Sequence, residues 1–451
     1  MARLLNLWDA LRGSFWFLPA LITALAAALA LGLLALDRRL DNQQLAGLLW
    51  LYAGGAEGAR SLLSAVAGSI ITVVGLAFSI TIVSLQLAAA QLGPRLLRNF
   101  VRDPGNQVVL GIFVATFVYC LLVLRTVRGR DGLADGTFVP HLAITGALGL
   151  AMLSVALLIY FIHHASISIQ ADHVIASVAR ELDGVIDKLW PDRFGHEDGE
   201  AAAAPPCAVT DGSAVAAHGG GYVTTLDEKA LLRAGRDRDV VVHLTRRPGD
   251  FLMAGEPLAW VLPADRVDED LKRVITSAVV LGAERSLLQD AMFGIEQLVE
   301  IAVRALASGH IDPTTGLRCI DRLGAAVARI GGRDLPAPYR RDAAGIVRVV
   351  MPALTLDDIV VAAFTPIRLQ GAGSRSVALR LLETFARVAA RHDRRGLHLA
   401  LLGEALRVRR AATAALTDPA DREAVQAAFE RVLRVSRPDA RRDLDVGGLA
   451  A

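Results

Sequence analysis

The sequence predicts a membrane α-helical domain with four transmembrane helices, joined to a soluble α+β part in which a small β module precedes a helical domain. Three observations support this fold class. The 451 residues are 53% hydrophobic and have a mean hydropathy of +0.42, values that are high for a soluble protein. Four long apolar runs all lie before residue 163. Short β-like segments and then helical periodicity follow after residue 206.

The transmembrane domain is predicted over residues 1–166. Its four spans are expected at about 15–36, 62–90, 108–124 and 142–162, each long enough to cross a bilayer. The aromatic residues 15–17 at the start of the first run are typical of a membrane interface. This run is too long for a signal peptide, and no small-residue cleavage site follows it.

Four spans place both termini on one side of the membrane. Arginines flank the spans almost equally on the two sides, so the positive-inside rule is nearly undecided. The soluble half has no paired cysteines and nothing that resembles an export signal for so large a domain. We therefore expect a multi-pass inner (plasma) membrane protein with cytoplasmic termini.

Composition argues against several kinds of site. The net charge is +2, so no global field attracts nucleic acid, and no nucleic-acid partner is expected. Cys120, Cys207 and Cys319 are too far apart for a disulfide framework or a zinc site. Three histidines lie near the exit of the fourth span, at His163, His164 and His173. Interfacial roles are more common than metal binding at such a place, so no metal and no cofactor is expected.

The soluble half begins with a connecting helix and a flexible linker, together over residues 167–206. The linker is rich in charge, alanine and proline. A small β module is predicted over 207–265, where two apolar runs are separated by a Pro-Gly-Asp turn (248–250) and an Ala-Gly-Glu turn (254–256).

Four residues of these turns, Gly249, Asp250, Leu252 and Gly255, resemble the hairpin of lipoyl- and biotinyl-type barrel-sandwich domains. A carrier domain of that type would show a lysine at an exposed hairpin tip. Lys229 instead lies in the helical pattern LDEKALL. The module is therefore expected to be barrel-sandwich-like and structural, without a swinging cofactor.

The helical domain is predicted over 266–436, and residues 437–451 are expected to form a disordered tail. Residues 267–307 show helical periodicity. Asp312 before Pro313 is typical of an N-cap, and Thr355 with Asp358 is typical of a capping box. Further helices are expected at about 375–391, 395–414 and 419–434.

The second span carries a continuous face of small and polar residues at the helical period: Ser64, Gly68, Thr72, Gly75, Ser79 and Gln86. Serine and threonine can bond to a carbonyl one turn back, but Gln86 needs a partner on another helix, or water. Two interpretations stay open. The face packs helices together, or it lines a hydrated path in the bundle or at an oligomer axis. The span holds no charged residue, so no charge relay is visible.

Two further groups of polar residues stand out. Gly93 and Pro94 should end the second span, and Arg95, Arg98 and Arg102 then share one face of a short interfacial elbow. The elbow is read as a membrane anchor or as a sensor of bilayer tension. The soluble domain has a polar face formed by Arg285, Gln289, Asp290, Glu296, Glu300, Arg304 and Asp312. A solvated or subunit-contact role is favoured there over cation binding or acid–base catalysis.

Several strings resemble a bacterial family of predicted membrane proteins, domain of unknown function 2254. They lie at 78–103, 111–124, 161–164, 221–251 and 284–306. In the segment ASGHIDPTTG, residues Asp312, Pro313, Thr314 and Thr315 match the family pattern. Five residues of the segment depart from that pattern, namely Ala307, Ser308, His310, Ile311 and Gly316. The resemblance implies an architecture and a bacterial source, not an activity.

The predicted function is an oligomeric channel or transport-like protein for an ion or small solute. Its second span would line the pore, and its cytoplasmic part would assemble or regulate a homo-oligomer in the lipid bilayer. The alternative is a non-conducting scaffold or signalling protein whose soluble domain binds a protein partner. An enzyme is not expected, because the sequence shows no Walker A motif, nucleophile elbow or His-Glu-x-x-His.

Overall fold

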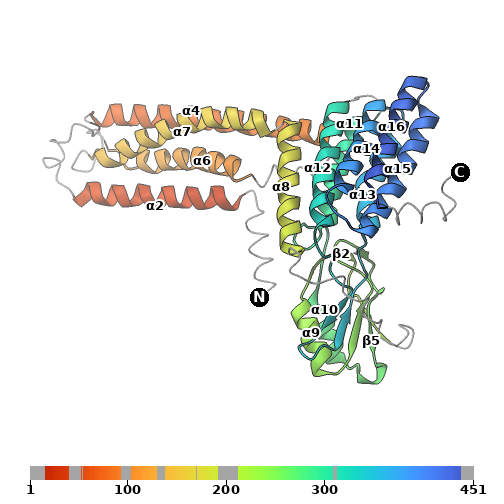
Figure 1. The fold of residues 1–451 in the computed structure, drawn as a ribbon. Helices are drawn as coiled ribbons and strands as arrows, with labels where there is room; N and C mark the ends of the chain where they lie inside the picture. Colours follow the sequence, from red (N-terminus) through yellow and green to blue (C-terminus); the bar gives the residue numbers. More distant parts are fainter. Residues whose placement is uncertain are drawn as a thin grey trace. The chain divides into compact units, whose positions relative to one another are not determined.

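A computed structural model describes residues 16–39, 52, 54–92, 103–128, 138–168, 170–190, 212–307 and 312–437. The chain divides into two compact units, Met1–His173 and Val174–Ala451. Figure 1 labels the helices and strands of both units. The expected linker at 191–206, the elbow at 94–102 and the tail after residue 437 lie outside the described residues.

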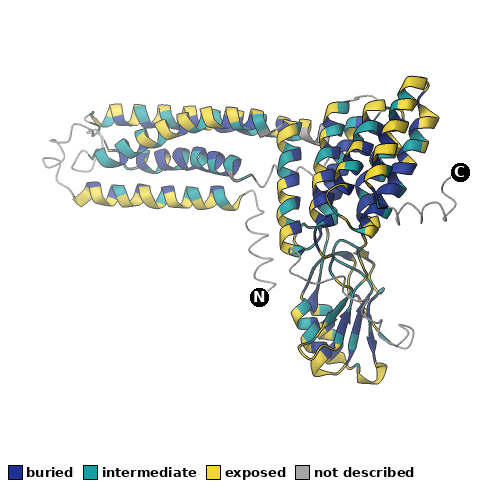
Figure 2. Ribbon diagram, viewed as in Figure 1, coloured by how far each residue is buried: buried dark blue, intermediate teal, exposed yellow. Residues whose placement is uncertain are grey.

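The first unit contains four long helices, α2 (Phe17–Arg39), α4 (Ala56–Leu92), α6 (Pro104–Leu124) and α7 (His141–Ser168). All four are long and apolar enough to cross a membrane, which agrees with the four predicted spans. The α6 span is 56% buried, against 22% for each of the other three. Figure 2 shows α6 as the most enclosed helix, whereas α2 and α4 expose one side along their length. This enclosure explains why α6 is apolar all round.

Two apolar clusters hold the four helices together. One contains Leu63, Tyr119 and Ile144, from α4, α6 and α7, and it also takes Leu34 from α2. The other contains Ile70, Phe113 and Phe161, again from α4, α6 and α7. The central helix α6 therefore contributes to both clusters, and α4 packs along it with a single face.

The start of α7 is tied to the end of α2 by a buried carboxylate. Asp37 accepts hydrogen bonds from the backbone N–H groups of Leu142 and Ala143, each at 3.0 Å. These N–H groups lie in the first turn of α7, where no intrahelical acceptor exists. Asp37 thus caps a helix that begins more than a hundred residues later.

We expect Asp37→Ala to lower the unfolding free energy of the first unit by about 1–2 kcal/mol, because a lost N-cap costs about that much. Hydrogen exchange of the full-length protein in detergent should show faster exchange at the start of α7. Glu57→Ala is the matched control, since Glu57 is an exposed acid in the first turn of α4. Equal effects of the two substitutions would contradict the capping role of Asp37.

The second unit contains two small sheets. The five-stranded sheet has the order β1-β5-β3-β8-β7, and the three-stranded sheet has the order β4-β2-β6. All pairings are antiparallel except that of β3 with β8. The strands are β1 (Ser213–Ala216), β2 (Gly221–Leu226), β3 (Val241–Leu244), β4 (Phe251–Leu252), β5 (Pro257–Leu262), β6 (Val279–Gly282), β7 (Tyr339–Arg341) and β8 (Val347–Val350).

The sheets extend beyond the segment predicted as the β module. Helices α9 (Glu228–Asp237) and α10 (Glu269–Ala278) pack on them, and three strands come from residues after 265. The helical prediction for 267–307 is wrong in its middle, because β6 separates α10 from α11 (Ala291–Leu306). The β-branched pair Val279 and Val280 is paired with β2, and this tertiary pairing outweighs the helical period. A barrel-sandwich arrangement stays a prediction.

A layer of helices forms the rest of the second unit. It contains most of α8 (Ala171–Leu189), together with α11, α12 (Pro313–Gly331), α13 (Leu356–Gly371), α14 (Arg375–Ala389), α15 (Arg395–Ala415) and α16 (Pro419–Val435). The last three agree with the predicted helices to within about one or two residues, the usual uncertainty of helix ends. The capping box of Thr355 and Asp358 is confirmed at the start of α13.

Candidate functional site

The small and polar face predicted on the second span lies on the outside of the four-helix unit. All six of its residues are exposed on α4. The buried residues of α4, such as Leu63, Ile70 and Val74, face α6 and α7 instead. At 3.6 residues per turn, the two sets lie on opposite sides of the helix. The face therefore does not line the interior of this four-helix unit.

The glycines and hydroxyls of this outer face leave its surface smooth. A Cβ added to Gly68 or Gly75 would meet nothing within 4 Å. The Thr72 hydroxyl donates to the carbonyl of Gly68 at 3.0 Å, so it is satisfied within the helix. Large apolar side chains flank the face, because Ile71 and Leu76 are 47% and 56% exposed. We call Ser64, Gly68, Thr72, Gly75 and Ser79 the α4 outer face.

Gln86 lies nearer the C-terminal end of α4 than the residues of the α4 outer face. The 37 residues of α4 span about 55 Å, which exceeds the roughly 30 Å of a hydrocarbon core. Gln86 lies six residues before the end at Leu92, and about 14 Å beyond Ala77, the last buried apolar residue among those of α4 whose side chains the structure describes. An exposed amide is tolerated near a helix end, where it can reach headgroups and water. The centre of the span is occupied by Thr72 and Gly75.

Sequence reasoning missed a polar cluster where α6 begins. Asp103 accepts a hydrogen bond from the Gly105 N–H at 2.9 Å and so caps α6. Its other oxygen lies 2.5 Å from Nε2 of His164 on α7, and the His164 ring stacks on Tyr160. The Asp-Pro pair before an apolar run was the available signal. The cluster joins α6 to α7.

The residues of the polar face predicted in the soluble part make separate contacts with different partners. Arg285 bridges two carboxylates, with Nε 2.8 Å from Asp290 and Nη1 2.5 Å from Glu296. The Gln289 amide accepts from the Leu226 N–H at 2.8 Å and donates to the Leu226 carbonyl at 3.2 Å. The Gln289 side chain thus makes the pair of hydrogen bonds to β2 that the backbone of a neighbouring strand would make.

Asp290 makes a further local contact, and Asp312 and Glu300 have local partners of their own. Asp290 caps α11 by accepting from the Phe293 N–H at 3.1 Å, and its burial raises the pKa of the carboxyl, which the Arg285 guanidinium partly offsets. Asp312 caps α12, and hydrogen bonds from Thr315 lower its pKa. Glu300 and Arg304 pair at 3.4 Å across one helical turn. These contacts are those of structural ion pairs and caps.

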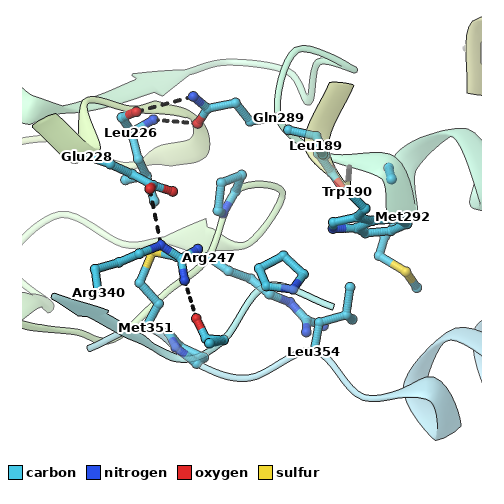
Figure 3. Close-up of a pocket in the computed structure, with 16 residues that line it drawn as sticks. Leu189, Trp190, Leu226, Glu228, Arg247, Gln289, Met292, Arg340, Met351 and Leu354 are labelled. Atoms are coloured by element: carbon cyan, nitrogen blue, oxygen red, sulfur yellow. Dashed lines mark hydrogen bonds and ion pairs between the residues drawn. The ribbon is translucent and has the colours of Figure 1, made fainter. Parts of the chain in front are cut away.

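A cavity of about 260 Å³ lies in the second unit, beside Gln289 and Asp290. Segments far apart in the sequence line it: the end of α8, the start of α9, the turn at 247–248, the start of α11 and residues 336–354. Figure 3 shows Trp190 and Met292 on one side, and Glu228 with Arg340 on the other. The sequence had no signal for this cavity, because its lining comes together only in the folded unit.

Within the described ranges, no three His, Cys, Asp or Glu side chains are grouped so that they could hold a metal ion. The structure thus offers two features for function, the α4 outer face and the cavity. One of these features belongs to each unit.

Comparison with known proteins agrees with this architecture. An uncharacterized protein of Mycobacterium bovis and one of Mycobacterium tuberculosis are each 33% identical over 432 residues, which cover 95% of this chain and 81% of theirs. No solved structure matches the chain. The family described as a predicted membrane protein, domain of unknown function 2254, matches residues 12–387. With its four helices of membrane-spanning length and apolarity, the chain belongs to this family of predicted membrane proteins.

Proposed function

We propose that the protein is an oligomeric channel or transport-like protein, in which the α4 outer faces of several copies surround a hydrated path. The observation that carries this proposal is the outward position of the face at the centre of the span. A path at an oligomer axis requires small and polar residues on the outside of each four-helix unit, which is where Gly68, Thr72 and Ser79 lie.

The pattern across α4 supports the same arrangement. Small residues let neighbouring helices approach closely, and large apolar residues on either side give those neighbours a packing surface. On α4, Ile71 and Leu76 flank the outer face and are exposed. In an assembly, such flanking side chains would contact adjacent copies while the hydroxyls of Thr72 and Ser79 face the axis. Uncharged hydroxyls favour weak, non-selective contact with a small solute over tight ion binding.

The alternative is a non-conducting scaffold in which the same face is fully packed against a second helix. The satisfied hydroxyl of Thr72 suits this arrangement as well, because it needs no water. In both versions the proposal places the soluble unit in the cytoplasm, since that half lacks paired cysteines. The two versions differ in whether the α4 outer face contacts water at the centre of the span.

Cysteine accessibility of the full-length protein in native membranes separates them. We expect Thr72→Cys and Ser79→Cys to react with a membrane-impermeant thiol reagent, because both would face water. Leu76→Cys is the matched control on the same helix, and we expect it to stay unreactive in lipid or at a subunit contact. Cys120 and Cys319 are buried, Cys207 lies outside the described residues, and unsubstituted protein measures the background reaction of all three.

Planar-bilayer recordings then test conduction directly. Wild type should give single-channel steps, and Ser79→Leu should reduce or abolish them, because leucine narrows and dries the path. Unreactive cysteines at both polar positions, together with the absence of steps across voltage and tension, would reject the channel and favour the scaffold. Reaction at position 76 as strong as at 72 would show that the reagent does not distinguish the faces as proposed.

A further inference from the structure

We propose that the cavity in the second unit binds a small organic monoanion, a carboxylate on an apolar body. This ligand site goes beyond the proposed function and does not depend on it. The argument rests on three features of the cavity: apolar lining residues, two arginines with unused donors, and a carboxylate beside them, Glu228, that disfavours a second negative charge on the ligand.

Apolar side chains line much of the cavity. Trp190 and Met292 stand across from Glu228 and Arg340, whereas Met351 lies beside Arg340, and Leu354 and several prolines complete the apolar lining. Tryptophan and methionine are adaptable surfaces for flat or short apolar groups. At about 260 Å³, the cavity is near the lower end of small-molecule sites. This size suits an aromatic or short-chain acid and is too small for a lipid or a nucleoside triphosphate.

Arg340 offers the first set of donors. Its Nε donates to Glu228 at 3.1 Å, and its Nη1 donates to the Ala337 carbonyl. Nη2 has no acceptor among the described residues. The side chain is only 20% exposed, so water solvates it poorly. A guanidinium held in this way presents its remaining N–H groups in a fixed direction, which suits a carboxylate.

Arg247 offers the second set. Its Nη1 makes a long bond of 3.4 Å to the Ala353 carbonyl, and its Nε lies 3.9 Å from Asp250, at the limit of an ion pair. Neither contact is a strong one by distance. The carboxylate of Asp250 is instead held by the backbone N–H of Arg247 at 2.9 Å. Arg247 can therefore turn toward an anion in the cavity without breaking a short bond.

The charges that line the cavity cancel, because Arg247 and Arg340 stand against Glu228 and Asp290. Asp290 is paired with Arg285, which does not line the cavity, so it does not occupy the donors of Arg247 or Arg340. Glu228 accepts from Arg340 and would repel a dianion. The lining thus fits a carboxylate better than a phosphate monoester, although both groups pair with arginine.

Binding of phenylacetate to the full-length protein in lipid nanodiscs tests this inference. Isothermal titration gives the affinity, and the fluorescence difference between wild type and Trp190→Phe reports occupancy of the cavity. We expect phenylacetate to bind, the uncharged phenylacetamide to bind at least tenfold more weakly, and phenyl phosphate to bind more weakly than phenylacetate. The tenfold figure corresponds to about 1.4 kcal/mol, the lower range for a hydrogen bond to a charged group.

Four variants locate the site. Arg247→Gln and Arg340→Gln should each weaken phenylacetate binding about tenfold or more. Leu354→Trp should abolish it by filling the cavity while both arginines remain. Arg273→Gln is the matched control, because Arg273 is exposed on α10 and pairs only within its own helix turn. Circular dichroism melting curves identify any variant that fails to fold.

Three results would overturn the inference. The first is the absence of phenylacetate binding by folded wild type at millimolar concentration. The second is equal binding of phenylacetamide, which would mean that the arginines do not recognise the charge. The third is tighter binding of phenyl phosphate, which would contradict the monoanion. None of these results bears on the accessibility of α4, so the channel proposal stands or fails separately.

Discussion

Glu404→Ala is expected to lower the unfolding free energy of the helical layer in the second unit by about 3–5 kcal/mol, the usual cost of removing one partner from a buried ion pair. Glu404 lies on α15 and is fully buried. Its two oxygens accept from Arg368 at 2.8 Å and from Arg407 at 2.9 Å. The first of these contacts joins α15 to α13.

The expected loss of unfolding free energy is large because Glu404→Ala leaves the charge of Arg368 without its carboxylate partner. The Arg368 side chain is 13% exposed, so the alanine variant would leave a guanidinium charge largely without solvent or a carboxylate. Arg407 is half-exposed and can turn to water. The double substitution Glu404→Leu with Arg368→Leu removes both buried charges, and it should recover most of the lost stability.

Hydrogen exchange of the full-length protein measures this effect where it occurs, in α13 and α15. Glu423→Ala is the control, because Glu423 is exposed on α16 and its removal should change the free energy by no more than about 0.5 kcal/mol. A loss below about 1 kcal/mol for Glu404→Ala, well under the usual cost of orphaning a buried charge, would contradict this reading.

Gly249→Ala is expected to cost about 2–4 kcal/mol, from backbone strain and steric conflict together. Gly249 has φ +97°, a conformation that L-residues rarely adopt. A Cβ there would also come within 3.0 Å of three atoms of the Asp290 carboxylate. Because Asp290 pairs with Arg285 and caps α11, it cannot move without breaking those contacts.

The substitution Gly255→Ala distinguishes backbone strain from steric conflict as the cause of the loss. Gly255 has φ +84°, yet an added Cβ would meet nothing within 4 Å. This variant should therefore show only the backbone cost, about 1–2 kcal/mol. Hydrogen exchange at the start of α11 should accelerate in Gly249→Ala and not in Gly255→Ala. Equal losses in the two variants would mean that Asp290 accommodates the methyl group.

Much of the fold follows from local pattern. The four membrane-length helices, the Asp312 cap and the capping box at Thr355 were all predictable, because each depends on residues close together in the sequence. The strand β6 was not predictable. Val279 to Gly282 follow a helix directly, and their partner β2 lies more than fifty residues earlier. Because the two strands are so far apart in the sequence, their pairing leaves no periodic pattern in the residues of β6 themselves.

The candidate sites divide in the same way. The α4 outer face was visible as a repeat of small residues, but the repeat could not say whether it faces inward or outward. Helical spacing grouped Gln289 and Asp290 on one helix face, but both precede α11, which begins at Ala291, and their roles came from contacts with Leu226 and Arg285. The cavity had no sequence signal, since Trp190 and Arg340 are separated by 150 positions.

By itself, the sequence determined the four apolar helices and the helix caps, because hydrophobic length and capping chemistry act between near neighbours. Only the tertiary structure decided that the polar side of α4 points away from α6. The apolar side of α4 covers α6, because it excludes lipid and water from the central helix better than the polar side would. The tertiary structure also decided that Arg247, Arg340 and Trp190 meet around one cavity. Burial and charge pairing act through space, and they determine which of the predicted polar residues remain accessible to a partner or a ligand.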